Sequence, residues 1–179
     1  MTKKQKRKLV NRILTIATIL LAAALIVVCV FVIKDKKKVR TAEVDLTDRV
    51  TAQALVWLSE IQDMPLSYDE VKACMGSVVL RCEDTPTGEK GVYTRKAVPE
   101  SYGGCYENAY AGLENAYVKV FNDRIEKKGQ EGKYTKEDVD KTVQKAYGIS
   151  LREYLVSKIL LLPSEEELLA EIEGEVRYE

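Results

Sequence analysis

The sequence predicts a mostly α-helical fold, in which one N-terminal transmembrane helix precedes a helical domain that carries a small β-hairpin. Three observations predict it. Residues 13–33 form an unbroken apolar run, ILTIATILLAAALIVVCVFVI, with basic segments on both sides. Downstream, Ser or Thr followed three residues later by an acidic residue repeatedly precedes apolar positions at helical spacing. Two β-prone stretches, residues 77–83 and 92–98, flank the turn-rich segment DTPTGEKG.

The apolar run is long enough to predict a membrane span. As a helix it reaches about 30 Å, the thickness of the hydrocarbon core. A cleavable signal peptide is the alternative, but its apolar core usually covers about 7–15 residues and ends at small residues, whereas lysines follow here. We therefore predict a basic cytoplasmic tail at 1–12, a signal-anchor helix at 13–33, a basic connector at 34–44 and a soluble α-helical domain at 45–179.

Charge is distributed unevenly along the chain. It has 28 Lys and Arg and 28 Asp and Glu, but residues 1–40 are almost purely basic and the remainder is acidic. The positive-inside rule favours a single-pass protein of the cell membrane with its C-terminal domain extracytoplasmic. In the alternative, both basic blocks contact the lipid bilayer from the cytoplasmic side. An acidic domain also argues against nucleic acid as a partner, because binding phosphate requires clustered cations.

The elements of the domain follow from capping and spacing. Helices are expected at 47–61, before Pro65; at 67–75, from the capping box Ser67–Glu70 to Gly76; at 105–128; at 135–147, capped by Thr135; at 150–162, from the capping box Ser150–Glu153; and from Ser164 to Val176, after Pro163. Residues 77–83 and 92–98 are the two strands of the hairpin, and residues 99–104 are expected to form a loop.

The residues that are missing restrict the chemistry. The chain has no histidine, which removes Ser-His and Cys-His nucleophile pairs and His-bearing zinc sites. It also has no Gly-rich phosphate loop. We therefore expect no catalytic residues, no metal and no cofactor, and we do not expect an enzyme.

Three cysteines lie beyond the apolar run: Cys74, Cys82 and Cys105. In an oxidising compartment one disulfide among them is permitted, with one thiol left over. In a reducing compartment all three would be small apolar residues. Their spacing matches no zinc motif, and it does not choose between the pairings.

Residues 118–162 contain a long helix ending in a Lys/Gly-rich turn, then the capped segment TKEDVD, the segment YGISLREY and an apolar stretch. This order resembles the helical chaperone module shared by SurA-type and PrsA-type foldases and trigger factor. The resemblance implies a non-catalytic, chaperone-like surface that holds extended or unfolded chain. The parvulin-type isomerase domain that often follows this module does not follow it here, so no isomerase activity is expected.

The apolar and aromatic positions in and beside the matching segment are the candidate contacts. They are Tyr117, Phe121, Tyr147, Tyr154, Leu155 and Ile159. The plainer interpretation is that they belong to the core. Two functions remain open: a membrane-tethered module that binds a peptide or unfolded client, and a structural subunit of a larger membrane assembly. The first predicts a concave, partly exposed apolar surface, and the second a flat apolar patch matched to a protein subunit.

Overall fold

The computed structural model describes residues 3–36, 39–62, 66–129 and 132–179. The chain divides into two units, Met1–Arg40 and Thr41–Glu179, and each is described by itself.

The first unit is helix α1 (Lys3–Lys36). Its described side chains run from Leu14 to Val30, and all of them are exposed. No helix in the described part of the chain has both the length and the apolar character that crossing a membrane requires. The side chains of the predicted basic tail (1–12) lie outside the described ones. The same is true of residue 13 and residues 31–33, at the two ends of the predicted span.

This finding corrects three predictions at once. It contradicts the transmembrane helix in the predicted fold class, the signal-anchor and single-pass character, and the localisation in the cell membrane. What the structure supports of the fold class is a mostly helical chain with a four-stranded sheet.

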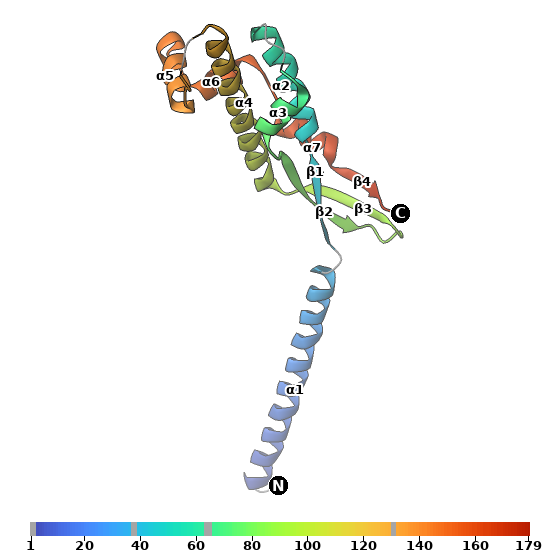
Figure 1. Ribbon diagram of the computed structural model, residues 1–179. Coiled ribbons are helices and arrows are strands. Elements are labelled where there is room, and N and C mark those ends of the chain that lie inside the picture. The colour runs from blue at the N-terminus through green and yellow to red at the C-terminus, as the bar shows by residue number, and fades with distance from the viewer. Residues whose placement is uncertain (1–2, 37–38, 63–65, 130–131) are drawn as a thin grey trace. The chain divides into compact units, whose positions relative to one another are not determined.

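The second unit contains both helices and strands, and its last element is a strand (Figure 1). In chain order they are β1 (Arg40–Asp45), α2 (Thr47–Gln62), α3 (Tyr68–Met75), β2 (Val79–Pro86), β3 (Val92–Ala97), α4 (Pro99–Lys127), α5 (Lys136–Tyr147), α6 (Leu151–Lys158), α7 (Glu165–Ile172) and β4 (Gly174–Arg177). The sheet order is β1-β2-β3-β4. The pairs β2/β3 and β3/β4 are antiparallel, so the predicted hairpin is confirmed as the centre of a larger sheet.

Side-chain caps start four of these helices. In α3, α5, α6 and α7 the N-cap hydroxyl accepts from the backbone N–H three residues on, and the acidic side chain at that position accepts from the N-cap backbone. These reciprocal bonds satisfy N–H groups that have no partner inside the helix. The helix starts predicted at Ser67, Thr135, Ser150 and Ser164 are therefore confirmed.

The start of one helix and the end of another differ from the prediction within the helical part of the domain. Helix α4 begins at Pro99, inside the predicted loop, because proline suits the first helical position, where its missing N–H costs nothing. Helix α6 ends at Lys158, four residues before the predicted end at Leu162. Ile159 is extended, with φ −144° and ψ 138°, and breaks the helix there.

Two strands were not predicted. Strand β1 occupies part of the predicted connector at 34–44. Strand β4 occupies the end of the predicted last helix, so Val176 lies in the sheet. Helix α7 stops at Ile172, and Gly174 then adopts φ +142°, which an L-residue rarely adopts and which directs the chain along β3.

Helix α4 is the centre of the core. It packs against α2, α3, α5, α6 and β2, and Tyr110, Leu113 and Val120 on it are fully buried. Its contact with α3 is very close, because a Cβ at Gly112 would lie 2.5 Å from the Cα of Met75. Glycine at this position is therefore a requirement of the packing rather than of the helix.

Candidate functional site

An open groove of about 430 Å³ lies between α2 and the chain that leaves α6. We call it the apolar groove, and its lining residues are Ala52, Gln53, Val56, Trp57, Glu60, Ile159 and Leu160. The side chains of Val56 and Leu160 are 60% and 70% exposed. Trp57 is buried to 8% exposure, so its ring belongs to the base of the groove.

A buried tyrosine places one wall of the groove. The Tyr110 hydroxyl donates to the Ile159 carbonyl at 3.0 Å and accepts from the Leu161 N–H at 3.1 Å. Burial raises the pKa of Tyr110, so the hydroxyl keeps the proton that it donates. Leu161 is completely buried. These contacts hold the chain extended after α6 and place Leu160 outward.

Four rings continue the apolar groove as a row. We call Trp57, Tyr117, Tyr154 and Tyr147 the aromatic row. The ring centroids are 6.5 Å apart from Trp57 to Tyr117, 6.3 Å from Tyr117 to Tyr154 and 4.7 Å from Tyr154 to Tyr147. The Lys158 ammonium lies 5.6 Å from the centre of the Tyr154 ring. Rings at these distances attract one another in offset or edge-on arrangements.

Two tyrosines of the aromatic row, Tyr117 and Tyr154, are neutral near physiological pH. Burial, together with the neighbouring tyrosines, raises the pKa of Tyr154 to about 12. Burial also raises the pKa of Tyr117. Both hydroxyls therefore remain protonated, and these two residues offer apolar ring faces with neutral hydrogen-bonding groups.

Comparisons of this chain with protein-family models, with curated proteins and with solved structures found no match. The resemblance of residues 118–162 to a foldase module therefore stays a prediction.

The structure brings four of the six predicted contact residues together and places the other two elsewhere. Tyr117, Tyr147, Tyr154 and Ile159 gather on the apolar groove and the aromatic row. Phe121 is half-buried beside Tyr134 instead, with 5.5 Å between the ring centroids. Leu155 is fully buried in the core.

Sequence reasoning missed the residues that α2 contributes. Val56 lies outside the apolar stripe Val50, Ala54, Trp57 and Leu58, all of which are buried. A valine on the polar side of a helix was the available signal, because a large apolar side chain there has no place in the core.

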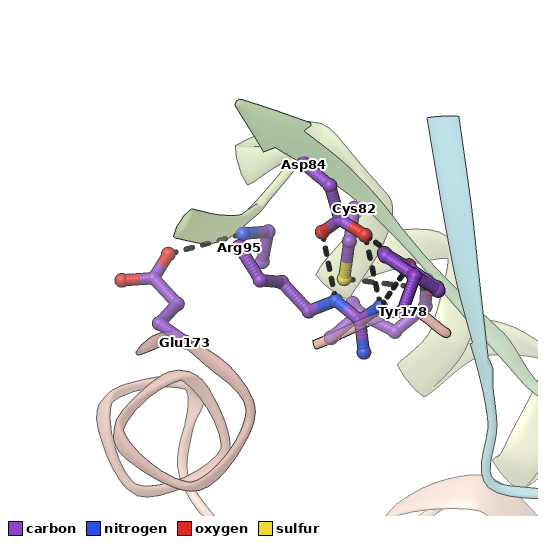
Figure 2. A network of polar contacts seen from close by, with 7 residues as sticks. Cys82, Asp84, Arg95, Glu173 and Tyr178 are labelled. Atoms are coloured by element: carbon purple, nitrogen blue, oxygen red, sulfur yellow. Dashed lines mark hydrogen bonds and ion pairs between the residues drawn. The ribbon is translucent and has the colours of Figure 1, made fainter. Parts of the chain in front are cut away.

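A polar network near the C-terminus was also not predicted (Figure 2). The Asp84 side chain is completely buried and accepts from Arg95 Nε at 2.9 Å and Nη2 at 3.0 Å. The Tyr178 hydroxyl contacts the same carboxylate and accepts from Arg95 at 2.9 Å. The carboxylate of Glu173 accepts from the Ala97 N–H at 3.1 Å.

These contacts hold the end of the chain against the sheet. The hydrogen bonds from Arg95 to Asp84 raise the pKa of Arg95 above its ordinary value. Every polar side-chain atom buried in the described part of the chain has a hydrogen-bond partner. A network with its donors and acceptors already matched is structural, and it leaves no group directed at a ligand.

The three predicted disulfide candidates carry free thiols. Cys82 and Cys105 are buried and Cys74 is half-buried, and burial raises the pKa of all three. A raised pKa lowers the thiolate fraction and hence the reactivity. Within the described ranges no cluster of His, Cys, Asp or Glu is arranged to hold a metal ion.

Proposed function

We propose that residues 41–179 form a non-catalytic binding module, chaperone-like in action, that holds segments of polypeptide on the apolar groove and the aromatic row. One observation carries this proposal. Val56, Tyr147 and Leu160 are the most exposed large apolar or aromatic side chains described in this unit, at 60%, 60% and 70%. Val56 and Leu160 line the apolar groove, and Tyr147 is the last ring of the aromatic row that begins at Trp57 in the groove.

The dimensions and chemistry of the surface suit a polypeptide. About 430 Å³ lies within the range of about 300–1,000 Å³ that is usual for ligand sites. The groove is open, so a chain can enter and leave on either side of an anchoring side chain. Tyrosine rings next to it offer contact area and hydroxyls at a small cost in side-chain entropy. Gln53 and Glu60 supply a polar rim.

The alternative is a structural subunit whose permanent partner covers the same residues. For a subunit we expected a flat apolar patch. The surface is a shallow, open groove, and the space of about 430 Å³ beside the Trp57 ring supports reversible binding of a chain segment instead.

The experiment uses Trp57, the single tryptophan of the protein, as the reporter. Reduced, carboxymethylated ribonuclease A is a permanently unfolded chain without tryptophan, so emission changes belong to Trp57. We expect a saturable change in emission for the full chain. Val56→Lys places a charge in the groove at an exposed position and should weaken binding at least tenfold.

Gln144→Lys is the matched control, because Gln144 is exposed on α5 and does not line the groove. It adds the same charge and should leave the titration unchanged. Equal binding by wild type and Val56→Lys, or weakening to the same degree by both variants, would contradict the proposed site.

A further inference from the structure

The chain that leaves α6 has one edge occupied and one edge open. Successive residues of an extended chain direct their N–H and C=O groups to opposite edges. The Ile159 C=O and the Leu161 N–H, which are two residues apart, both bond the Tyr110 hydroxyl. These groups therefore define the inner edge.

Leu160 lies between them, so its N–H and C=O point to the other edge. Within the described ranges neither group has a hydrogen-bond partner in the protein. Its side chain is 70% exposed and lines the apolar groove. A donor and an acceptor on one exposed residue, next to the extended residue Ile159, are the two groups that an opposite residue of an antiparallel pair would use.

We propose that the bound polypeptide is extended and pairs with Leu160 through two backbone hydrogen bonds, one to its N–H and one to its C=O. This inference rests on the proposed function and names the form of its ligand. In such a pair the opposed side chains lie on the same face of the two strands. The peptide residue opposite Leu160 therefore places its side chain in the apolar groove, where an apolar or aromatic group is favoured.

The acidic side chain that lines the groove favours basic residues beside the apolar anchor of the bound segment. Glu60 is the only charged residue among those lining the groove. No salt bridge to it is found among the described residues. A cation on the peptide next to the apolar anchor would therefore gain an ion pair. The ligand class is an extended segment with one apolar residue among basic and small polar ones.

An amphipathic helix is the competing ligand for an apolar groove. A helix satisfies its own backbone groups and would leave Leu160 unpaired, so removing single peptide N–H groups distinguishes the two.

The probe is the Trp-free peptide Lys-Ser-Lys-Ser-Phe-Ser-Lys-Ser-Lys, titrated against the full chain with Trp57 emission as the signal. Methylation of the Phe nitrogen removes the donor for the Leu160 carbonyl and should weaken binding about tenfold. Methylation of either neighbouring Ser nitrogen, which faces away from Leu160, should weaken it no more than about twofold.

The protein side of the test is Leu160→Pro against Leu160→Ala. Both lose the leucine side chain, but only proline loses the N–H. We expect Leu160→Pro to bind about fivefold more weakly than Leu160→Ala. Circular dichroism checks that both variants are folded, and the peptide series on wild type stands if the proline variant is not.

The outcomes separate this inference from the proposed function. If wild type binds the peptide and all methylated forms bind equally, backbone pairing is wrong and the binding module stands. If wild type binds unfolded ribonuclease A but not the peptide, the ligand class is wrong. If wild type binds neither, both proposals fail.

Discussion

Removal of the Tyr110 hydroxyl tests how the groove wall is held. Tyr110→Phe keeps the fully buried ring and deletes two hydrogen bonds, one of 3.0 Å to the Ile159 carbonyl and one of 3.1 Å from the Leu161 N–H. Each such bond contributes about 0.5–1.5 kcal/mol net. The free energy of unfolding should therefore fall by about 1–3 kcal/mol, or roughly 30-fold in the unfolding equilibrium at about 2 kcal/mol.

Urea denaturation followed by Trp57 emission measures this loss, as a lower midpoint at unchanged slope. Tyr106→Phe is the matched control. Tyr106 lies one turn earlier on α4, with its ring 4.5 Å from that of Tyr110, and its hydroxyl makes no hydrogen bond within the described residues. The control should change stability by less than about 0.5 kcal/mol. Equal effects of the two substitutions would refute the assignment of the hydroxyl as the support of the wall.

Three further predictions concern the fold that carries the groove. Asp84→Asn breaks a buried ion pair and should lower the free energy of unfolding by about 3–5 kcal/mol in urea denaturation. Asp48→Asn, in an exposed ion pair, should have a much smaller effect, and similar losses for the two variants would contradict the network. Gly112→Ala should lower the free energy of unfolding by about 1–3 kcal/mol, because the new methyl group clashes with α3. Gly104→Ala, on the same helix but with open space around it, should raise the free energy of unfolding by up to about 1 kcal/mol. A greater stability of Gly112→Ala than of Gly104→Ala would refute the close contact. The hydrogen bonds from the Ser67 backbone and hydroxyl, aided by Lys119, lower the pKa of Glu70 from 4.5 to about 2. Because the pKa is lower in the folded state, the stabilisation by the Glu70 carboxylate is complete above about pH 5 and is lost as the pH falls towards 2. The urea midpoint of Glu70→Gln should therefore fall less than that of wild type over this pH range.

Local signals made most helices predictable from the sequence. A capping box needs only a hydroxyl and a carboxylate three residues apart, and the four predicted starts are all present. The start of α4 was missed because a Pro followed by a Gly pair is typical of a loop. The helix forms anyway because its later turns are buried from Cys105 to Val120.

The remaining elements depend on contacts between distant residues. Strand β4 has four residues and forms because Val92 and Arg177 are paired across the sheet. Nothing within those four residues specifies a strand. The end of α6 is set in the same way, since the hydroxyl that holds the extended chain comes from Tyr110 on another helix.

The candidate site also has a part that local sequence patterns predict and a part that only the folded chain creates. Three residues of the aromatic row, Tyr117, Tyr147 and Tyr154, could be predicted, because each lies among the apolar positions of a predicted helix, whereas Trp57 was not among the predicted contacts. The groove itself could not be predicted, because Val56 and Leu160 lie at opposite ends of the domain's sequence and meet only in the folded chain.

Site-specific photo-crosslinking tests the central claim most directly. A p-benzoyl-phenylalanine placed at position 56 of the full chain, irradiated with reduced, carboxymethylated ribonuclease A, reports what contacts the groove. The same group at position 144, exposed on α5, is the control. We predict a crosslinked product from position 56, which an excess of the peptide Lys-Ser-Lys-Ser-Phe-Ser-Lys-Ser-Lys suppresses. We predict no product from position 144. No product from position 56, or equal products from both positions, would contradict a polypeptide-binding groove.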